Sequence, residues 1–161
     1  MAQIIVRFTN SSDFVGRAID FVTSSLIDHI ELGTKEGTWI GVRSDGGVQE
    51  RPDGYSKVTT DWRYPLECTD AQYNAIVVSA RADIGTKYDY SEIIGLLFHS
   101  RCMYSPHKLI CSRFAIAKLA EGGIHLLNVE PDFFYLVTPE MCHLSPLLRG
   151  LRQDFSPKKG K

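Results

Sequence analysis

The sequence predicts one α+β domain in which a small antiparallel sheet packs against helices. Its 161 residues are 43% hydrophobic and 23% charged, as in a globular domain long enough to bury a core. Runs that favour β-structure are concentrated in the first 66 residues, and helical patterns prevail after them. We therefore expect residues 1–161 to form a single domain, with a flexible tail from about residue 152 to 161.

The strands are expected where β-branched and aromatic residues gather between turn signals: residues 4–9, 29–34, 38–44, 55–66 and 133–137. A short Lys-Glu-Gly connection at 35–37 joins the second run to the third, which indicates an antiparallel meander. Pro65 lies near the end of the fourth run, where a missing N–H is tolerated. Residues 44–57 are rich in Gly, Asp and Pro and are expected to form a polar loop.

The helices are expected at residues 12–27, 70–83 and 93–98, from about residue 111 to the glycine pair at 122–123, and from residue 139. Thr69 and Gln72 form a capping box at the start of the second helix. Thr138 and Pro139 begin the last, because proline fits the first helical position. This order of elements, strands before helices, is the pattern of an α+β domain.

Charge and the ends of the chain argue against several classes of function. A net charge of −1, with no basic run except the terminal SPKKGK, argues against nucleic-acid binding. Neither a signal peptide nor a membrane span is expected, since no window approaches 18 apolar residues. We expect a cytoplasmic protein without a cofactor, and the oligomeric state stays open. The cysteines are then expected to remain reduced: Cys68, Cys102, Cys111 and Cys142.

Cys111 stands at the junction between a short apolar run and a predicted helix. The free N–H groups of a first helical turn, together with the positive end of the helix dipole, favour a thiolate over a thiol. The position therefore suits a nucleophile. It equally suits a small buried side chain, which is a common role for a free cysteine.

A cysteine nucleophile needs a partner that holds and returns a proton, and histidine is the usual choice. His29 opens a predicted strand that also carries Glu31 two residues later. Side chains two apart on a strand point to the same face, so the carboxylate can orient the imidazole and favour its charged form. The alternative is that His29 is a surface residue at the start of a strand.

Three segments together resemble a known family: DHIELGTKEGTWIGVRSDGGVQERP at 28–52, KYDYSEIIGLLF at 87–98 and LICSRFAIAKL at 109–119. They resemble the circularly permuted branch of the NlpC superfamily of papain-like cysteine peptidases. That branch contains YiiX-type proteins and is related to the lecithin-retinol acyltransferase group. The resemblance spans roughly residues 4–120 and implies a permuted papain-like fold, with the histidine strand before the cysteine helix and the nucleophile at a helix N-terminus.

The resemblance also implies site residues. It places the nucleophile at Cys111, the histidine at His29, and the tyrosine-aspartate motif at Tyr88 and Asp89. Many members carry a third polar residue on the strand after the histidine strand, where this sequence has Gly41. We take Glu31 as the substitute, with Asp45 as a second possibility. A missing third residue would leave a slower enzyme or a relic that binds without cleaving.

The implied reaction is acyl transfer on an amide or ester, with a peptide, an isopeptide or a lipid ester as substrate. Cys111 attacks the carbonyl, His29 takes and returns the proton, and Glu31 steadies the imidazolium. The backbone N–H of Cys111 supplies one oxyanion donor, and the Tyr88 hydroxyl is a candidate for the second. Tyr88 is equally well explained as a buried aromatic residue that closes the core.

Two other functions stay open. His99, Cys102, His107 and Cys111 have the chemistry of zinc ligands, although only four residues separate the two pairs, whereas structural zinc sites close a longer loop. The second is a non-catalytic module of the same fold that binds a peptide or lipid, since a fold does not fix a function.

Overall fold

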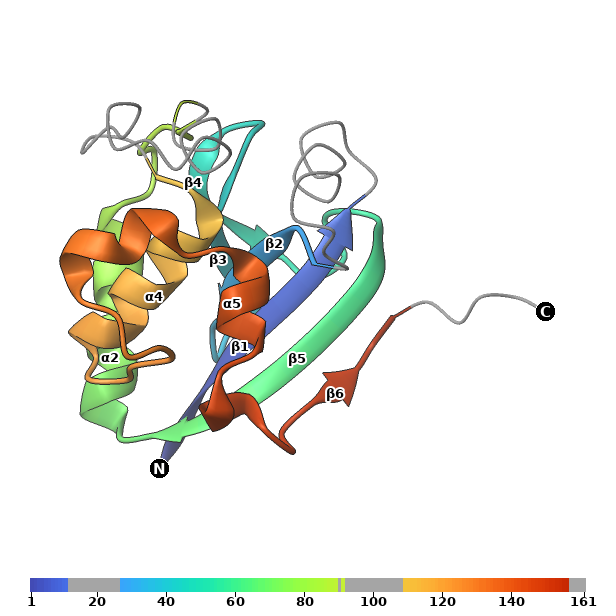
Figure 1. Cartoon of the computed structure of the whole chain (residues 1–161). Helices are drawn as coiled ribbons and strands as arrows, with labels where there is room; N and C mark the ends of the chain where they lie inside the picture. The colour runs from blue at the N-terminus through green and yellow to red at the C-terminus, as the bar shows by residue number, and fades with distance from the viewer. Residues whose placement is uncertain (12–26, 90, 92–108, 157–161) are drawn as a thin grey trace.

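The computed structural model describes residues 1–11, 27–89, 91 and 109–156, and its main feature is one six-stranded antiparallel sheet (Figure 1). The strand order across the sheet is β4-β3-β2-β1-β5-β6. The strands are β1 (Ala2–Ser11), β2 (His29–Gly33), β3 (Thr38–Arg43), β4 (Gly47–Pro52), β5 (Val58–Cys68) and β6 (Gln153–Asp154). The helices are α2 (Asp70–Ala82), α4 (Cys111–Glu121), α5 (Pro139–His143) and two 3₁₀ turns, η2 (Pro131–Leu136) and η3 (Pro146–Leu148). The α+β class and the antiparallel sheet are as expected from the sequence.

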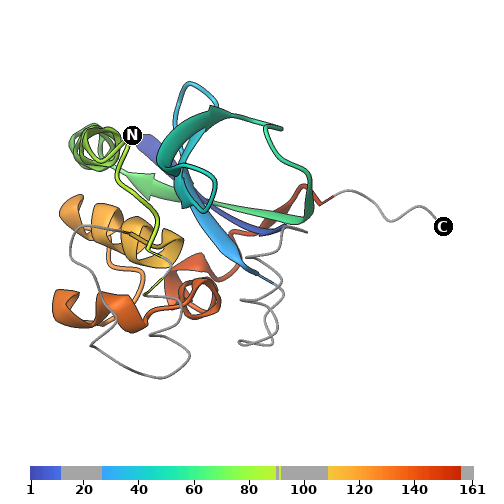
Figure 2. The same cartoon turned by 90° about the horizontal axis from the view of Figure 1, so that it is seen from above.

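One face of the sheet forms the hydrophobic core with the helices. Its strands present buried apolar residues at alternate positions: Ile4, Val6 and Phe8 on β1, Ile30 and Leu32 on β2, Ile40 and Val42 on β3. Helices α2 and α4 cover this face and contact each other, and Figure 2 shows the helices gathered on one side of the curved sheet. Alternation with a period of two puts the remaining strand residues on the opposite face.

That opposite face is polar, and several of its charged side chains are buried. Arg7 of β1 is the register partner of Glu31 on β2 and of Arg63 on β5, and all three point away from the helices. Gly41 of β3 lies across from Glu31, because Leu32 pairs with Ile40 one step along the ladder. The histidine and carboxylate predicted from the sequence therefore lie on a charged face of the sheet.

The two long helices begin as the sequence predicts. The Thr69 hydroxyl accepts a hydrogen bond from Gln72 N, and Thr69 N donates one to Gln72 Oε1, so the predicted capping box of α2 is confirmed. Cys111 is the first residue of α4, after Ile110 as the N-cap, and Gly122 is its C-cap. The helix predicted after Thr138 is α5, with Pro139 in its first turn.

The structure corrects two predicted elements. Residues 133–137 are not a strand: Pro131 starts a 3₁₀ turn, and Phe133 N donates to Glu130 O at 2.9 Å. The polar loop at 44–57 contains strand β4, which pairs with β3 along its length. Gly47 is required there, since a Cβ on it would lie 2.0 Å from Thr86 O.

The remaining predictions concern the end of the chain and the segments that the structure does not describe. Part of the expected tail is held, because β6 pairs with β5 and Phe155 N donates to Asp61 O at 2.8 Å. The helices predicted at 12–27 and 93–98 lie outside the described residues, apart from Ile27.

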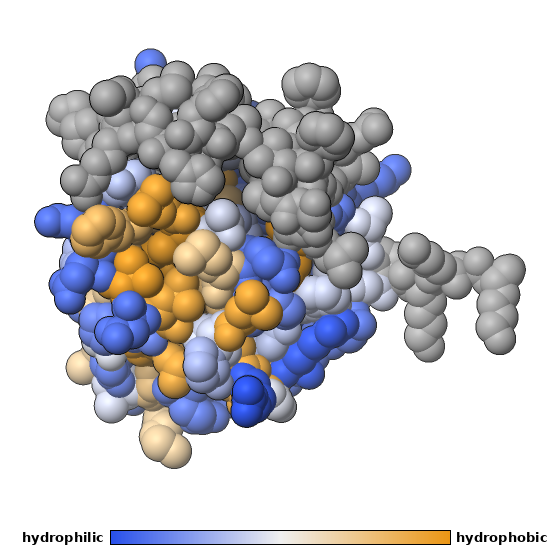
Figure 3. Space-filling model, in the orientation of Figure 1, coloured by the Kyte–Doolittle hydropathy of each residue, from blue (hydrophilic) through white to orange (hydrophobic). Residues whose placement is uncertain are grey.

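The face that carries α4, α5 and η2 exposes apolar side chains, which gather there in Figure 3. The most exposed is Leu144, at 70% of its surface, and the others in this part of the chain are Phe133, Met141 and Leu147. None of the helices in the described ranges combines the length and the apolar character needed to cross a bilayer.

Candidate active site

Cys111 lies where a helix start meets the beginning of a strand. It is the first residue of α4, and the N-cap residue, Ile110, makes no side-chain hydrogen bond to the N–H groups of that first turn. Its thiol is 3% exposed and lies 3.9 Å from the backbone oxygen of Asp28, the residue before His29. The structure thus brings the predicted nucleophile to the strand that carries the predicted histidine, although 82 positions separate them in the chain.

Ser112, the next residue, anchors this helix start from the other side. Its hydroxyl donates to the backbone oxygen of Val137, just before α5, and it is fully buried. The position of Cys111 is therefore fixed by two contacts from distant segments, one through Asp28 and one through Val137.

His29 is paired with a carboxylate. Its Nε2 lies 3.0 Å from Glu31 Oε1, and the Cys111 side chain is among the neighbours that raise the pKa of the imidazole. His29 is 7% exposed and Glu31 is 2% exposed, so these contacts lie in a region sheltered from water. The cysteine, the histidine and the glutamate are therefore brought together, with the imidazole paired to the carboxylate and the thiol 3.9 Å from the backbone of the residue before His29.

Glu31 reaches back to the imidazole because Gly41 leaves room for it. A Cβ on Gly41 would lie 2.9 Å from Glu31 Cγ and 3.4 Å from Glu31 Oε1. The space over Gly41 is therefore filled by the Glu31 side chain from the neighbouring strand β2. Gly41 stands where the resembled family carries its third polar residue, and here the polar group at that place is the Glu31 carboxylate.

Two further side chains hold the Glu31 carboxylate. The Tyr55 hydroxyl donates to Oε1, the oxygen that faces the imidazole, and Arg7 Nη1 donates to Oε2 at 3.1 Å. Arg7 also makes a bidentate pair with Asp61, through Nε at 3.0 Å and Nη2 at 2.8 Å. Two-point pairing of this kind fixes the guanidinium plane, and with it the donor that Arg7 directs at Glu31.

These contacts set the charges at the site. Burial alone lowers the pKa of His29, but the charge of Glu31 and hydrogen bonds with Cys111 and Glu31 outweigh it and raise that pKa from 6.5 to about 10. Burial alone raises the pKa of Glu31, but His29, Tyr55 and Arg7 outweigh it and lower that pKa from 4.5 to about 2. At neutral pH the imidazole is therefore a cation held against an ionised carboxylate.

Tyr88 and Asp89 lie on the segment just ahead of the nucleophile. Tyr88 forms a parallel bridge with Leu109, and Asp89 N donates to Leu109 O at 2.9 Å. Tyr88 is buried, and Asp89 accepts hydrogen bonds from the backbone and hydroxyl of Ser91. The Tyr-Asp motif thus positions the residues that lead into α4.

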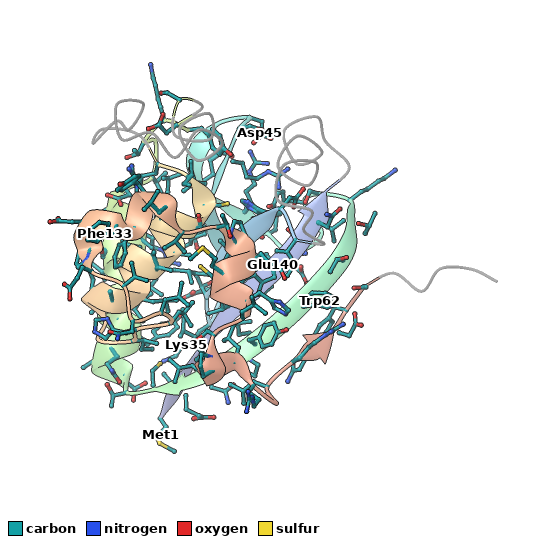
Figure 4. The ribbon with its side chains drawn as sticks, viewed as in Figure 1. Met1, Lys35, Asp45, Trp62, Phe133 and Glu140 are labelled. Atoms are coloured by element: carbon teal, nitrogen blue, oxygen red, sulfur yellow. The ribbon has the colours of Figure 1, made fainter. Side chains whose placement is uncertain are left out.

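Asp45 is not the residue at the imidazole, which corrects the second possibility raised for the third position. It lies in the turn between β3 and β4, at one end of the sheet in Figure 4. Its carboxylate accepts from Arg51 at 3.2 Å on each oxygen and lies 3.6 Å from Arg43 Nε. The histidine contact belongs to Glu31.

The zinc alternative depends on His99, Cys102 and His107, which lie outside the described residues. Within the parts of the chain that the structure describes, no group of three or more His, Cys, Asp or Glu side chains is arranged to hold a metal ion. Cys68, Cys111 and Cys142 are free thiols.

Tyr55 and Arg7 were not predicted from the sequence. Arg7 had a usable signal, because a charged residue in the middle of the first strand breaks the apolar pattern on the face that also carries Glu31. Tyr55 had none, since it lies where the expected polar loop at 44–57 meets the expected strand at 55–66. No protein-family model matches the chain, and a search of curated proteins found no match.

Proposed function

We propose that this protein is a cysteine hydrolase that acts by acyl transfer on an amide or ester, with a permuted NlpC-type papain-like fold. One observation carries the proposal: Cys111 begins a helix with its thiol 3.9 Å from the backbone oxygen of Asp28, and the next residue, His29, is paired with a buried carboxylate at 3.0 Å. A thiolate, a proton donor and an orienting carboxylate are the parts that thiol acyl transfer needs.

In the first half of the proposed reaction, the thiolate of Cys111 attacks the carbonyl carbon of the substrate. The charge that develops on the carbonyl oxygen meets the N–H of Cys111 at the helix start, with the Tyr88 hydroxyl as the candidate second donor. The imidazolium of His29 then gives its proton to the leaving nitrogen or oxygen, and the carbon–heteroatom bond breaks. A thioester on Cys111 remains, and His29 is neutral.

In the second half, neutral His29 takes a proton from water while the water oxygen attacks the thioester carbon. The carbon–sulfur bond breaks, which releases the acid and restores the thiolate next to a protonated imidazole. Glu31 keeps its charge throughout and holds the ring, because its own pKa of about 2 leaves it ionised at neutral pH. The substrate is proposed by class: a peptide, an isopeptide or a lipid ester.

An acyl-trapping experiment tests the proposal. The protein is mixed with 4-nitrophenyl acetate, and intact mass spectrometry follows a single acetyl adduct, located by peptide mapping. We expect the adduct at Cys111, its loss in Cys111→Ala, and its retention in the matched control Cys68→Ala, which removes another buried thiol. An adduct that persists in Cys111→Ala, or that never forms, would contradict the proposed function.

A second candidate function is binding of a peptide or lipid without turnover, which the exposed apolar side chains of this fold favour. Leu144 directly follows α5, Leu147 lies in η3, and both are exposed, so that an acyl chain can contact them. Binding without turnover predicts that a lipid or peptide associates equally well with Cys111→Ala and that no acyl adduct forms. The two functions are therefore separated by the same variant.

A further inference from the structure

Both oxygens of the Glu31 carboxylate accept hydrogen bonds, one from a charged side chain and one from a neutral side chain. Arg7 on Oε2 is a cation that is already paired with Asp61. Tyr55 on Oε1 is a neutral donor that approaches the same oxygen as His29 Nε2. The stem of Glu31 is confined as well, since its Cγ fills the space over Gly41. The head and the stem of this side chain are therefore both fixed.

The direction of the Tyr55 hydroxyl is itself determined. Arg43 Nη1 donates to the Tyr55 oxygen at 3.2 Å, and an arginine has no acceptor to offer in return. A tyrosine hydroxyl carries one proton, so that proton is left for Glu31. The Arg43 guanidinium also lies 5.3 Å from the Tyr55 ring centroid, and Arg51 lies 5.1 Å from it. Cations on the ring and at the oxygen make the hydroxyl a stronger donor toward the carboxylate.

On the basis of the proposed function, we infer that Tyr55 is a positioning residue: its hydroxyl, oriented by Arg43, holds Glu31 against His29 and keeps the carboxylate ionised. Tyr55 reaches no reacting atom itself and acts through Glu31. It comes from the segment between β4 and β5, so that segment takes part in assembling the site although it lies far from Cys111 in the chain.

The titration of Glu31 depends on groups from four elements and one connecting segment. These groups are His29 on its own strand, Arg7 on β1, Arg43 on β3, Asp61 on β5 through Arg7, and Tyr55. Arg7 and Arg43 favour the carboxylate by charge, and Asp61 offsets part of the charge of Arg7. Tyr55 adds a hydrogen bond without adding a charge, so its removal tests the hydrogen bond itself.

The test replaces Tyr55 with phenylalanine, with Tyr73→Phe as the matched control. Tyr73 is buried, whereas Tyr55 is half-buried, and the Tyr73 hydroxyl accepts a hydrogen bond from Lys35 N, outside the site. The Glu31 carboxyl is followed by carbon-13 NMR against pH, together with the acid limb of Cys111 alkylation. In Tyr55→Phe we expect both midpoints to rise by about one pH unit, a tenfold change in acidity, because one hydrogen bond to the charged form is lost. Tyr73→Phe is expected to leave both midpoints unchanged.

A second variant keeps the inference testable if Tyr55→Phe does not fold. Arg43→Gln retains the tyrosine and removes the guanidinium that directs its proton, so the Glu31 midpoint is again expected to rise. An unchanged midpoint in a folded Tyr55→Phe protein, or in folded Arg43→Gln if the first variant is unfolded, would overturn the assignment. An equal rise in Tyr73→Phe would also overturn it.

A double-mutant cycle separates positioning from packing. In a Glu31→Gln background, Tyr55→Phe is expected to have no further effect on the Cys111 alkylation rate, because the carboxylate it acts on is absent. A full effect in that background would show that Tyr55 works by packing alone. These titrations need no substrate, so a failed acyl-trapping experiment would contradict the proposed function and leave the role of Tyr55 to be decided by its own test.

Discussion

Gly41→Ala adds a single methyl group directly opposite the carboxylate that holds the imidazole. The new Cβ would lie 2.9 Å from Glu31 Cγ, whereas non-bonded carbons prefer about 3.5–4.0 Å. The φ of Gly41 is not in the left-handed region, so the substitution strains no backbone torsion. Its whole effect should therefore come from the contact with Glu31.

The size of the effect follows from that distance. Relief of the contact requires Glu31 Cγ to move by about 0.6–1 Å. The separation between Glu31 Oε1 and His29 Nε2, now 3.0 Å, would then approach the length at which a hydrogen bond is lost. Overpacking of this kind costs about 1–3 kcal/mol in the free energy of unfolding. We expect such a loss, together with slower alkylation of Cys111 near neutral pH as the imidazolium loses its counter-ion.

Urea unfolding and iodoacetamide labelling measure the two effects, and Glu31→Ala supplies the control background. That substitution removes Cγ, so Gly41→Ala should then cost little stability. If Gly41→Ala destabilises the protein equally in both backgrounds, the added methyl does not act through Glu31 and the account of the glycine is wrong.

The remaining predictions concern pH and thiol selectivity. The raised pKa of His29 means that its ion pair stabilises the fold fully below about pH 6.5, and that this stabilisation is lost as the pH rises through about 10. The lowered pKa of Glu31 means that its ion pairs stabilise the fold fully above about pH 4.5, and that this stabilisation is lost as the pH falls through about 2. The midpoint of thermal unfolding should therefore be highest between about pH 4.5 and 6.5. His29→Gln should reduce the loss of stability at alkaline pH, which is on the order of a few kcal/mol. If that loss is the same in His29→Gln, other groups cause it. Brief iodoacetamide treatment near pH 6.5 should label Cys111 first, although Cys68 is the more exposed residue, at 7% against 3%. Cys142 should react slowly, because burial raises the pKa of its thiol. If mass spectrometry shows Cys68 or Cys102 labelled as fast as Cys111, the thiol of Cys111 is not specially activated.

Local signals in the sequence were enough to predict the parts of the site that depend on one element. The start of α4 at Cys111 follows from the apolar pattern after it and from the glycine at its end. His29 and Glu31 share a face because a strand has a period of two. Each of these relations is set within a few residues, where chain geometry leaves little choice.

Relations that depend on register or on contacts between segments could not be read in the same way. The space over Gly41 is useful only because β2 and β3 pair so that Gly41 faces Glu31, and the sequence alone does not give that register. Strand β4 was hidden because Gln49, Glu50 and Arg51 make it resemble a polar loop. Residues 133–137 looked like a strand because aromatic residues favour β-structure, but Pro131 begins a 3₁₀ turn in which they lie.

The cost of burying these charges bears on the choice between catalysis and simple binding. Arg7, Glu31 and Asp61 are almost fully buried, and a buried ion pair is commonly no more stabilising than apolar side chains of similar volume. The opposite face of the same strands is packed with apolar side chains instead, with isoleucine, valine and phenylalanine at alternate positions. Binding of a peptide or lipid to exposed leucines would need no charged imidazole beneath the surface. A hydrolase needs one, because a thiolate attacks and an imidazolium protonates the leaving group only when the ring is held and charged before substrate arrives. We therefore favour acyl transfer as the proposed function, because it uses the charge network around His29, whereas contact with exposed leucines does not require that network.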